Sequence, residues 1–276
     1  MDALASWVEV AADAVAQSRT ACDELRWHEA YRRRWREVRA EASLRAAAAS
    51  AELEGARLGL DRVRALAAGA AVPSASPSAD LTDAVALGCV RANALVEGQM
   101  PDLGASGAAA LAPLSQVLAR LHTVVGLGWL PVDSLGRLRS DEPAQDLTGL
   151  GPAPSGRDVA ARIDLLGRTV ASTHAPALVV AAIAHAEVLA VRPFVAGNGA
   201  VARAVGRLLL TAGGLDPTGT ALPEVAWAAA PQPYLGAAAG YATGTVAGVA
   251  AWIDAYARAV VAGAAEARVV ADAVLG

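Results

Sequence analysis

The strongest chemical pattern in this sequence lies between residues 185 and 207. An apolar stretch ends at Arg192 and a proline, and the triplet Gly197-Asn198-Gly199 then opens a second stretch that contains Arg203. Glycine and asparagine tolerate positive φ angles, so the triplet can fold into a concavity of backbone N–H groups. A helix N-terminus adds partial positive charge at the same place. The spacing therefore predicts a phosphate-binding turn; a helix cap or a tight loop is the alternative explanation of the triplet.

The amino-acid composition limits how such a site can be built. The 276 residues include no lysine, so all 23 basic residues are arginine. This excludes the lysine-dependent phosphate loop of Walker-type NTPases, Schiff-base catalysis and the kinase-type ATP lysine. A net charge of −4 gives no sign of a nucleic-acid binder. A phosphate site in this chain must therefore use arginine and backbone amides.

The hydrophobic pattern is helical along almost the whole chain, which predicts an all-α fold. Within 2–69, which reads as two or more long helices, Trp27, Tyr31, Trp35 and Val38 recur at helical spacing and predict one apolar stripe. The proline- and serine-rich stretch 72–78 is expected to be a loop or linker. The longest irregular stretch is 139–156. Further helices are expected at 81–96, 113–125, 155–172, 176–191, 200–212, 232–241 and 246–273.

The sequence predicts a soluble, cytoplasmic protein. Acidic residues near the N-terminus argue against a signal peptide. The apolar stretch 175–191 contains His185 and Glu187, and the C-terminal run is also interrupted by charges, so neither provides the roughly 18–20 uninterrupted apolar residues of a bilayer span. Cys22 and Cys89 form no disulfide framework, which agrees with a reducing compartment.

The four histidines form no metal or catalytic group by spacing. His28, His122 and His174 are scattered, so we expect surface or core positions for them. His185 lies seven positions before Arg192, which places its ring about 10 Å from that residue along a helix. We expect His185 to be a buried core histidine.

The segment Arg192–Arg203 resembles the signature of the Fic (Fido) family, whose best-known members transfer AMP from ATP to a target hydroxyl. That signature reads His, often Pro, Phe, any residue, Asp or Glu, Gly, Asn, Gly, Arg, any two residues and Arg. Phe194, the Gly-Asn-Gly triplet and Arg203 match it. Phe194 is the only phenylalanine, and Asn198 is one of two asparagines, which favours their retention for a purpose. The Ala184-His185 pair upstream also resembles the family.

The resemblance spans roughly residues 45–262 and implies a Fic-type helical bundle with an N-terminal helical extension. On this basis we expect an N-terminal helical region at 1–72 and a Fic domain at 80–276, with its core at about 112–262. The stretch 139–156 would then hold the flap, a short loop or hairpin that docks target segments. The turn Gly136–Arg139 before it also resembles the family.

A second motif resembles the inhibitory helix of some family members, which carries Ser or Thr, three residues of any type, Glu, and Gly or Asn. The segment Ser50–Gly55 fits this pattern, on a helix expected around 45–58. The resemblance implies that Glu54 pairs with Arg203 and blocks productive placement of the ATP γ-phosphate. Ser50, Glu54 and Gly55 are thus the predicted inhibitory residues.

Three signature positions differ in this chain, and each change removes a role. Arg192 stands where the family has its general base, and a guanidinium with a pKa above about 12 cannot accept the proton. Ala196 replaces the acidic Mg²⁺ ligand, so no metal is expected at the signature. Ala200 replaces an arginine that contacts phosphates. Loss of the base alone is expected to cost roughly 10²–10⁴-fold in rate.

The sequence leaves three hypotheses. The first is a pseudoenzyme that has lost AMP transfer and binds a nucleotide, another phosphate ligand or a protein partner. Its binding residues would be Gly197, Asn198, Gly199, Arg203 and Arg192, with Arg192 either on the phosphate or solvated at the helix end. The second is a transferase with an altered donor or base. The third is a purely structural helical module. ATP or another nucleotide is the ligand that the resemblance implies; a protein target and a homodimer stay open.

Overall fold

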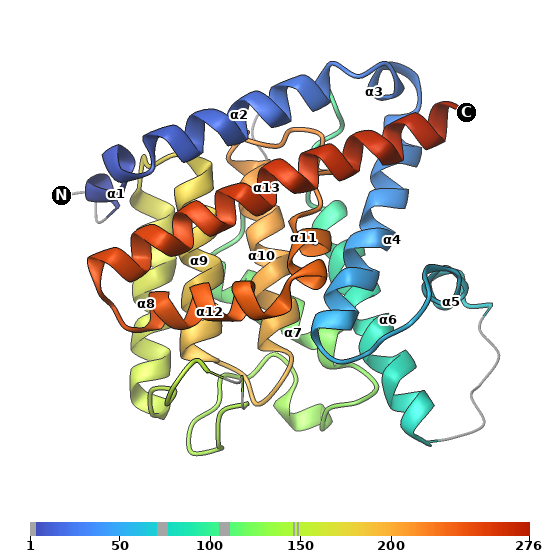
Figure 1. Cartoon of the computed structure of the whole chain (residues 1–276). Helices are drawn as coiled ribbons and strands as arrows, with labels where there is room; N and C mark the ends of the chain where they lie inside the picture. The colour runs from blue at the N-terminus through green and yellow to red at the C-terminus, as the bar shows by residue number, and fades with distance from the viewer. Residues whose placement is uncertain (1–3, 71–76, 105–110, 146, 148) are drawn as a thin grey trace.

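The computed structural model describes the chain except for residues 1–3, 71–76, 105–110, 146 and 148. Within the described residues it contains helices and no strand, which confirms the predicted all-α fold (Figure 1). A single short 3₁₀ helix, η1, covers Val132–Ser134. The α-helices are α1 (Ala5–Val10), α2 (Ala12–Arg26), α3 (Ala30–Arg33), α4 (Trp35–Leu53), α5 (Leu60–Ala67), α6 (Pro77–Glu97), α7 (Leu114–Gly126), α8 (Gly156–Ser172), α9 (Ala177–Val191), α10 (Asn198–Ala212), α11 (Pro223–Ala229), α12 (Pro231–Ala242) and α13 (Val246–Leu275).

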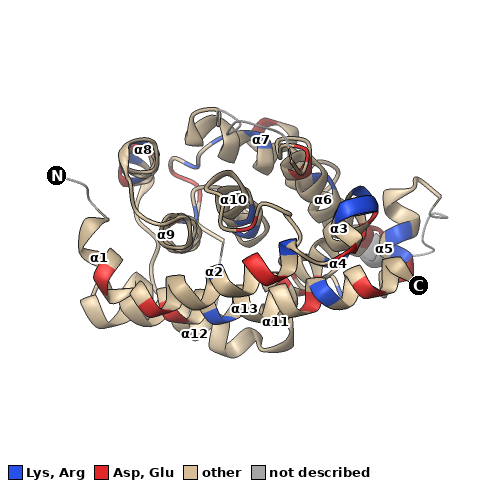
Figure 2. Cartoon of the chain, turned by 90° about the horizontal axis from the view of Figure 1, so that it is seen from above, with Lys and Arg blue, Asp and Glu red and all other residues tan. Residues whose placement is uncertain are grey.

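Two adjacent helices, α9 and α10, form the centre of the bundle. Each is buried around almost its whole circumference, and the two pack against each other along their lengths. A helix that is apolar on every side has to be covered by other helices. Figure 2 shows α9 and α10 inside a ring formed by the others. The loop that joins them, residues 192–197, carries the first half of the predicted signature and is therefore anchored at both ends in the centre of the bundle.

The N-terminal helices share the core of the rest of the chain. The long helix α4 packs against α6, α10, α11 and α13, and buries Ala47 and Ala51 in the same hydrophobic cluster as Val205 of α10. The helix α2 lies along α13, and both cross the face of the bundle together (Figure 1). The C-terminal end of α4 is thereby brought next to the first turn of α10.

One expectation about the helices is wrong, and one helix was missed. The stripe at residues 27–38 does not lie on one helix, because the chain turns between α2 and α4; Trp27 is 67% exposed whereas Tyr31 and Val38 are buried. The periodicity also failed to indicate α11. That helix begins at Pro223 and has only seven residues, which is too short for a hydrophobic period of 3.6 residues to be recognised.

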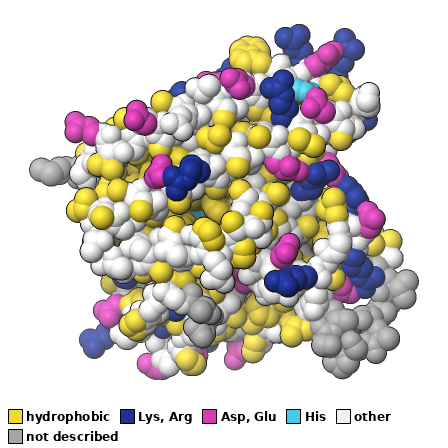
Figure 3. Space-filling model, in the orientation of Figure 1, with side chains coloured by type: hydrophobic (Ala, Val, Ile, Leu, Met, Phe, Trp, Pro, Cys, Tyr) yellow, Lys and Arg dark blue, Asp and Glu magenta, His cyan; other side chains and the backbone are white. Residues whose placement is uncertain are grey.

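Within the described residues, α13 is the one helix that is long and apolar enough to cross a membrane by length and composition. Its inward face, including Trp252 and Tyr256, packs in the protein core. Charged side chains of both signs lie next to one another on the face formed by α2, α12 and α13 (Figure 3), as in the Arg258–Asp254 pair. The cytoplasmic location expected from the sequence stays a prediction.

Candidate functional site

The loop between α9 and α10 begins and ends with a residue in the left-handed conformation. Arg192 ends α9 with φ +47°, and Gly197 begins α10 with φ +74°. A non-glycine residue in this region costs about 1–2 kcal/mol. Arg139 offsets part of that cost, because its Nε donates to the carbonyl of Arg192 (2.7 Å) and its Nη2 to that of Val191 (3.0 Å). These bonds satisfy carbonyls that a helix C-terminus leaves open.

Asn198 closes the loop through its side chain. Its Oδ1 accepts from the backbone N–H of Phe194 (2.9 Å), and its Nδ2 donates to the Phe194 carbonyl (2.9 Å). The Phe194 ring is fully buried and stacks on the imidazole of His122, with centroids 4.0 Å apart. The two signature residues that are rare in this composition thus build the loop itself.

His122 supports the loop from α7, 74 positions earlier in the chain. Its Nε2 donates to the carbonyl of Ala196 (3.2 Å), while its Nδ1 accepts from the N–H of Gly136 (2.9 Å). Burial lowers the pKa of His122 to about 4, so the ring is neutral at pH 7. The sequence predicts only a surface or core position for His122 and does not indicate that this residue supports the loop.

The pKa of His122 makes the stability of the protein depend on pH. The unfolded chain binds a proton on this ring near pH 6.5 and the folded chain only near pH 4, so acidification favours unfolding across that window. We expect the wild type to lose about 3 kcal/mol more unfolding free energy than His122→Gln between pH 7 and pH 4. Urea denaturation at both pH values measures the difference. Equal losses in the two proteins would contradict a neutral, buried His122.

The end of α4 fixes the position of Glu54. The N–H of Gly55, with φ +88°, donates to the carbonyl of Glu52 (2.9 Å), and the N–H of Ala56 donates to that of Ala51 (2.8 Å). This is the bond pair of a Schellman motif, which requires a left-handed residue just after the helix cap and therefore favours glycine there. Glu54 is the cap residue itself, so its backbone is held rigidly.

Ser50 and Glu54 lie one turn apart on α4 and both contact Arg203. The guanidinium donates from Nε to Ser50 Oγ (2.8 Å) and from Nη2 to Glu54 Oε1 (2.6 Å). The side chains of Arg203 and Glu54 are only 3% and 8% exposed. Burial opposes the charge on Arg203, but the carboxylate attracts it, and the pKa of Arg203 is raised above its usual value. The contact that the inhibitory motif implies is present.

Gly199 provides the space for this ion pair. A Cβ at this position would lie 2.2 Å from Glu54 Oε1 and 3.0 Å from Arg203 Nη1. The last residue of the Gly-Asn-Gly triplet therefore has to be glycine, because the Glu54 carboxylate occupies the space that a side chain would need. Ala200, the next residue, is buried at 2% exposure and brings no charge to the turn.

Arg192 is directed into the flap. It is 3% exposed, so it is not solvated at the helix end. Its Nη2 donates to the carbonyl of Gly151 (2.7 Å), and its Nη1 donates to that of Gln145 (3.5 Å). Both acceptors belong to the stretch 139–156, the predicted flap.

Gln145 also occupies the signature turn with its side chain. Its Oε1 accepts from the backbone N–H of Asn198 (3.3 Å) and from Asn198 Nδ2 (3.2 Å). Sequence reasoning missed this residue, since no motif marks it. Two donors of the predicted anion turn, both on Asn198, thus already have an acceptor, which is neutral and comes from the flap.

The signature does not fit a magnesium ion. Ala196 has no side-chain oxygen, and its carbonyl accepts from His122. The described residues contain no cluster of three or more His, Cys, Asp or Glu side chains suited to a metal. The ion that the family resemblance implies therefore has no protein ligand at this position.

A cavity of about 320 Å³ adjoins the ion pair. Glu54 and Arg203 lie in its wall, Arg57 at its edge is exposed, and Leu189 and Tyr234 add apolar surface. The Tyr234 hydroxyl is 2.7 Å from Nε2 of His185, and this histidine is fully buried, as predicted. An anion entering this cavity would meet Arg203 once Glu54 is displaced.

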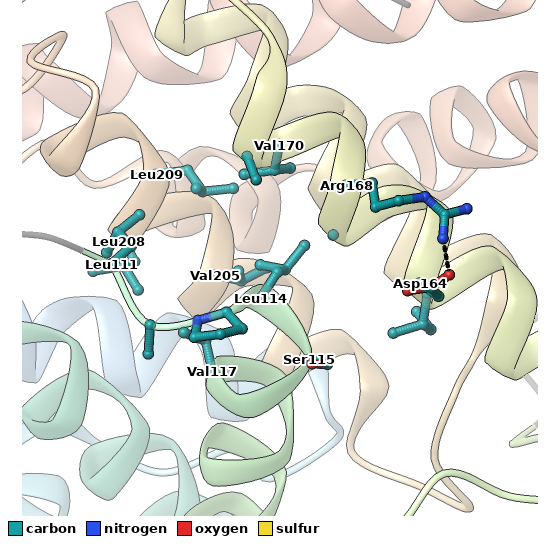
Figure 4. A pocket seen from close by; sticks show the side chains of 15 residues that line it. Leu111, Leu114, Ser115, Val117, Asp164, Arg168, Val170, Val205, Leu208 and Leu209 are labelled. Atoms are coloured by element: carbon teal, nitrogen blue, oxygen red, sulfur yellow. Dashed lines mark hydrogen bonds and ion pairs between the residues drawn. The ribbon is translucent and has the colours of Figure 1, made fainter.

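Another cavity, of about 460 Å³, lies far from this chemistry. It is bordered by α7, α8 and α10 and is lined mainly by aliphatic side chains, including Val205 and Leu209 (Figure 4). The ion pair between Asp164 and Arg168 stands at its edge. It adjoins the second half of α10, whereas the signature turn lies at the start of that helix, and this cavity shares no lining residue with the cavity beside the ion pair.

Comparison with known proteins agrees with the resemblance of the signature. The model of the Fic/DOC family matches residues 114–210, from α7 to most of α10. No curated protein matches the chain. A Fic family protein from Desulfovibrio desulfuricans G20 is similar in structure with a TM-score of 0.73 and 20% identity, covering 93% of this chain and 74% of that one.

Two further solved structures are also similar. Fic-1 (residues 134–508) from C. elegans has a TM-score of 0.66 and 18% identity, covering 96% of this chain and 73% of that chain. A Fic domain containing signaling protein from Bacteroides thetaiotaomicron VPI-5482 has a TM-score of 0.66 and 16% identity, covering 94% and 97%. Residues 114–210 therefore match the Fic/DOC family model, and the chain has the fold of Fic proteins.

Proposed function

We propose that this chain is a Fic-fold pseudoenzyme: it has lost AMP transfer and binds a nucleotide or a related phosphate ligand beside Arg203. The observation that carries the proposal is the state of Arg192. The residue at the family's base position is a buried guanidinium, hydrogen-bonded to the flap carbonyls of Gln145 and Gly151. A guanidinium stays protonated and cannot deprotonate a target hydroxyl.

Neither nearby histidine can replace the missing base. His122 uses both ring nitrogens to hold the loop, and its pKa of about 4 makes it a weak base. His185 is fully buried beside Tyr234, and burial lowers its pKa well below the usual value. Ala196 stands in place of the metal ligand. The signature therefore has neither a base for proton transfer nor an acidic residue to hold the ion that activates the phosphate.

Ligand binding is supported by features that remain. The cavity beside the ion pair has Arg203 in its wall and exposed Arg57 at its edge, which suits an anionic ligand. Tyr234, Leu189 and Leu235 offer apolar surface to a base or sugar. In this proposal Ser50, Glu54 and Gly55 are inhibitory because the Glu54 carboxylate and the Ser50 hydroxyl occupy the guanidinium of Arg203. The N-terminal region, 1–72, would then regulate the domain at 80–276.

Calorimetric titration with ATP, with and without Mg²⁺, tests this proposal. We expect weak binding to the wild type and at least tenfold tighter binding to Glu54→Ala, because the carboxylate no longer holds Arg203. Omitting Mg²⁺ should change the affinity less than threefold, since the signature has no ligand for the ion. Gln232→Ala, at an exposed residue that also borders the cavity, is the matched control and should stay within twofold of the wild type. No binding to Glu54→Ala would contradict the proposal, and so would transfer of labelled AMP by it.

A further inference from the structure

We propose that Gln145 and Arg192 form a latch that holds the flap closed on the signature turn, independently of Glu54. The inference rests on the proposed function, because it concerns access to the same site. It starts from the donors of the turn. The N–H of Asn198 is the first of α10, and the first N–H groups of a helix are the ones available to an anion. That donor and Asn198 Nδ2 both contact Gln145 Oε1.

The second half of the latch is the side chain of Arg192. It reaches from the end of α9 to the carbonyls of Gln145 and Gly151, both in the flap. An imidazole at this position is shorter and has at most two N–H groups, whereas a guanidinium has five N–H donors in a planar fork. The change from the family's histidine thus removes a base and supplies the longer reach and the donors that tie down the flap.

Both halves act on one residue. Arg192 holds the backbone carbonyl of Gln145, and Asn198 holds its side-chain oxygen. The partners of Glu54 are different: its carboxylate contacts Arg203, one turn further along α10. The site is therefore closed at two separate points. Removing Glu54 exposes Arg203 but leaves a neutral carboxamide on the amides of the turn, and an entering phosphate has to displace it.

Hydrogen–deuterium exchange of the ligand-free full chain tests the latch without any ligand. In Gln145→Ala and in Arg192→Met, the described amides of the flap between residues 139 and 156 should exchange at least tenfold faster than in the wild type. Gln145→Glu should slow them, because a carboxylate accepts the same bonds more strongly at a helix N-terminus. Gln116→Ala and Arg120→Met, both exposed on α7, are the matched controls and should leave the exchange of the flap amides unchanged.

The two Gln145 variants decide the test even where Arg192→Met fails to fold. Unchanged flap exchange in Gln145→Ala overturns the latch. ATP titration then separates the latch from the proposed function. Gln145→Ala combined with Glu54→Ala should bind ATP at least tenfold more tightly than Glu54→Ala alone. Faster flap exchange with no ATP binding in any variant would retain the latch and overturn the proposed function. Faster exchange with ATP affinity equal to that of Glu54→Ala would overturn the claim that the latch controls access.

Discussion

Arg203→Met is expected to lower the free energy of unfolding by about 3–5 kcal/mol, as measured by urea denaturation at pH 7. The substitution leaves the carboxylate of Glu54 buried, at 8% side-chain exposure, without its cationic partner. It also removes the donor to Ser50. Breaking one side of a buried ion pair costs far more than the pair contributes net, because the remaining charge stays desolvated. An exposed pair provides the control: Arg258→Met, on the surface of α13, should cost less than about 1 kcal/mol.

A double-mutant cycle separates this cost from lost packing. Glu54→Leu with Arg203→Met replaces both charges by apolar side chains, and such replacements of a buried pair are close to neutral. The double variant should therefore be more stable than Arg203→Met alone, by about 2 kcal/mol or more. Equal stability of the two would mean that the pair does not couple. Under the proposed function, this coupling would account for the retention of both residues in a chain without catalysis, because removing either one alone is expected to destabilise the fold.

Restoring the signature should produce the largest gain in activity. Glu54→Gly alone is expected to give no transfer of labelled AMP, since the base and the metal ligand are still absent. Adding Arg192→His, Ala196→Asp and Ala200→Arg should raise AMP transfer at least 10²-fold above the wild type, the lower end of what a general base supplies. Transfer to any protein, including the chain itself, is measured with ATP labelled in the α-phosphate.

Two variants control for the restored protein. The same combination with Arg192→Gln lacks only the base and should stay inactive. A version without Ala200→Arg shows whether the buried first turn of α10 accommodates an arginine, since Ala200 is only 2% exposed. A restored protein that binds ATP with Mg²⁺ but transfers nothing would show that the chain has lost more than the signature, for instance in the flap. Labelling by Glu54→Gly itself would contradict the loss of chemistry.

The helical fold and most helix positions were predictable because long apolar periods dominate the chain. The stripe through Trp27 and Val38 failed since periodicity does not register a turn that keeps the same spacing. The residues around the loop were not predictable in the same way. His122 and Gln145 contact it from 74 and 53 positions away, and no local pattern marks either.

The ion pair of Glu54 and Arg203 was anticipated only through the family resemblance. Its residues lie 149 positions apart, so nothing in their spacing joins them. The direction of Arg192 could not be derived at all. It depends on the path of the flap, an irregular stretch whose conformation follows from tertiary contacts and not from a repeating pattern.

The way α4 ends determines how Glu54 can separate from Arg203. Ala47 and Ala51 anchor the helix in the core, so it cannot swing away as a rigid rod. Glu54 instead depends on the last turn, which is closed by two backbone bonds around Gly55. Opening that turn frees the carboxylate by local unfolding, with the remainder of the helix in place. Freeing Arg203 from Glu54 thus costs the opening of one helical turn together with the loss of the buried ion pair. Under the proposed function, a ligand or partner that binds the opened segment would favour this state.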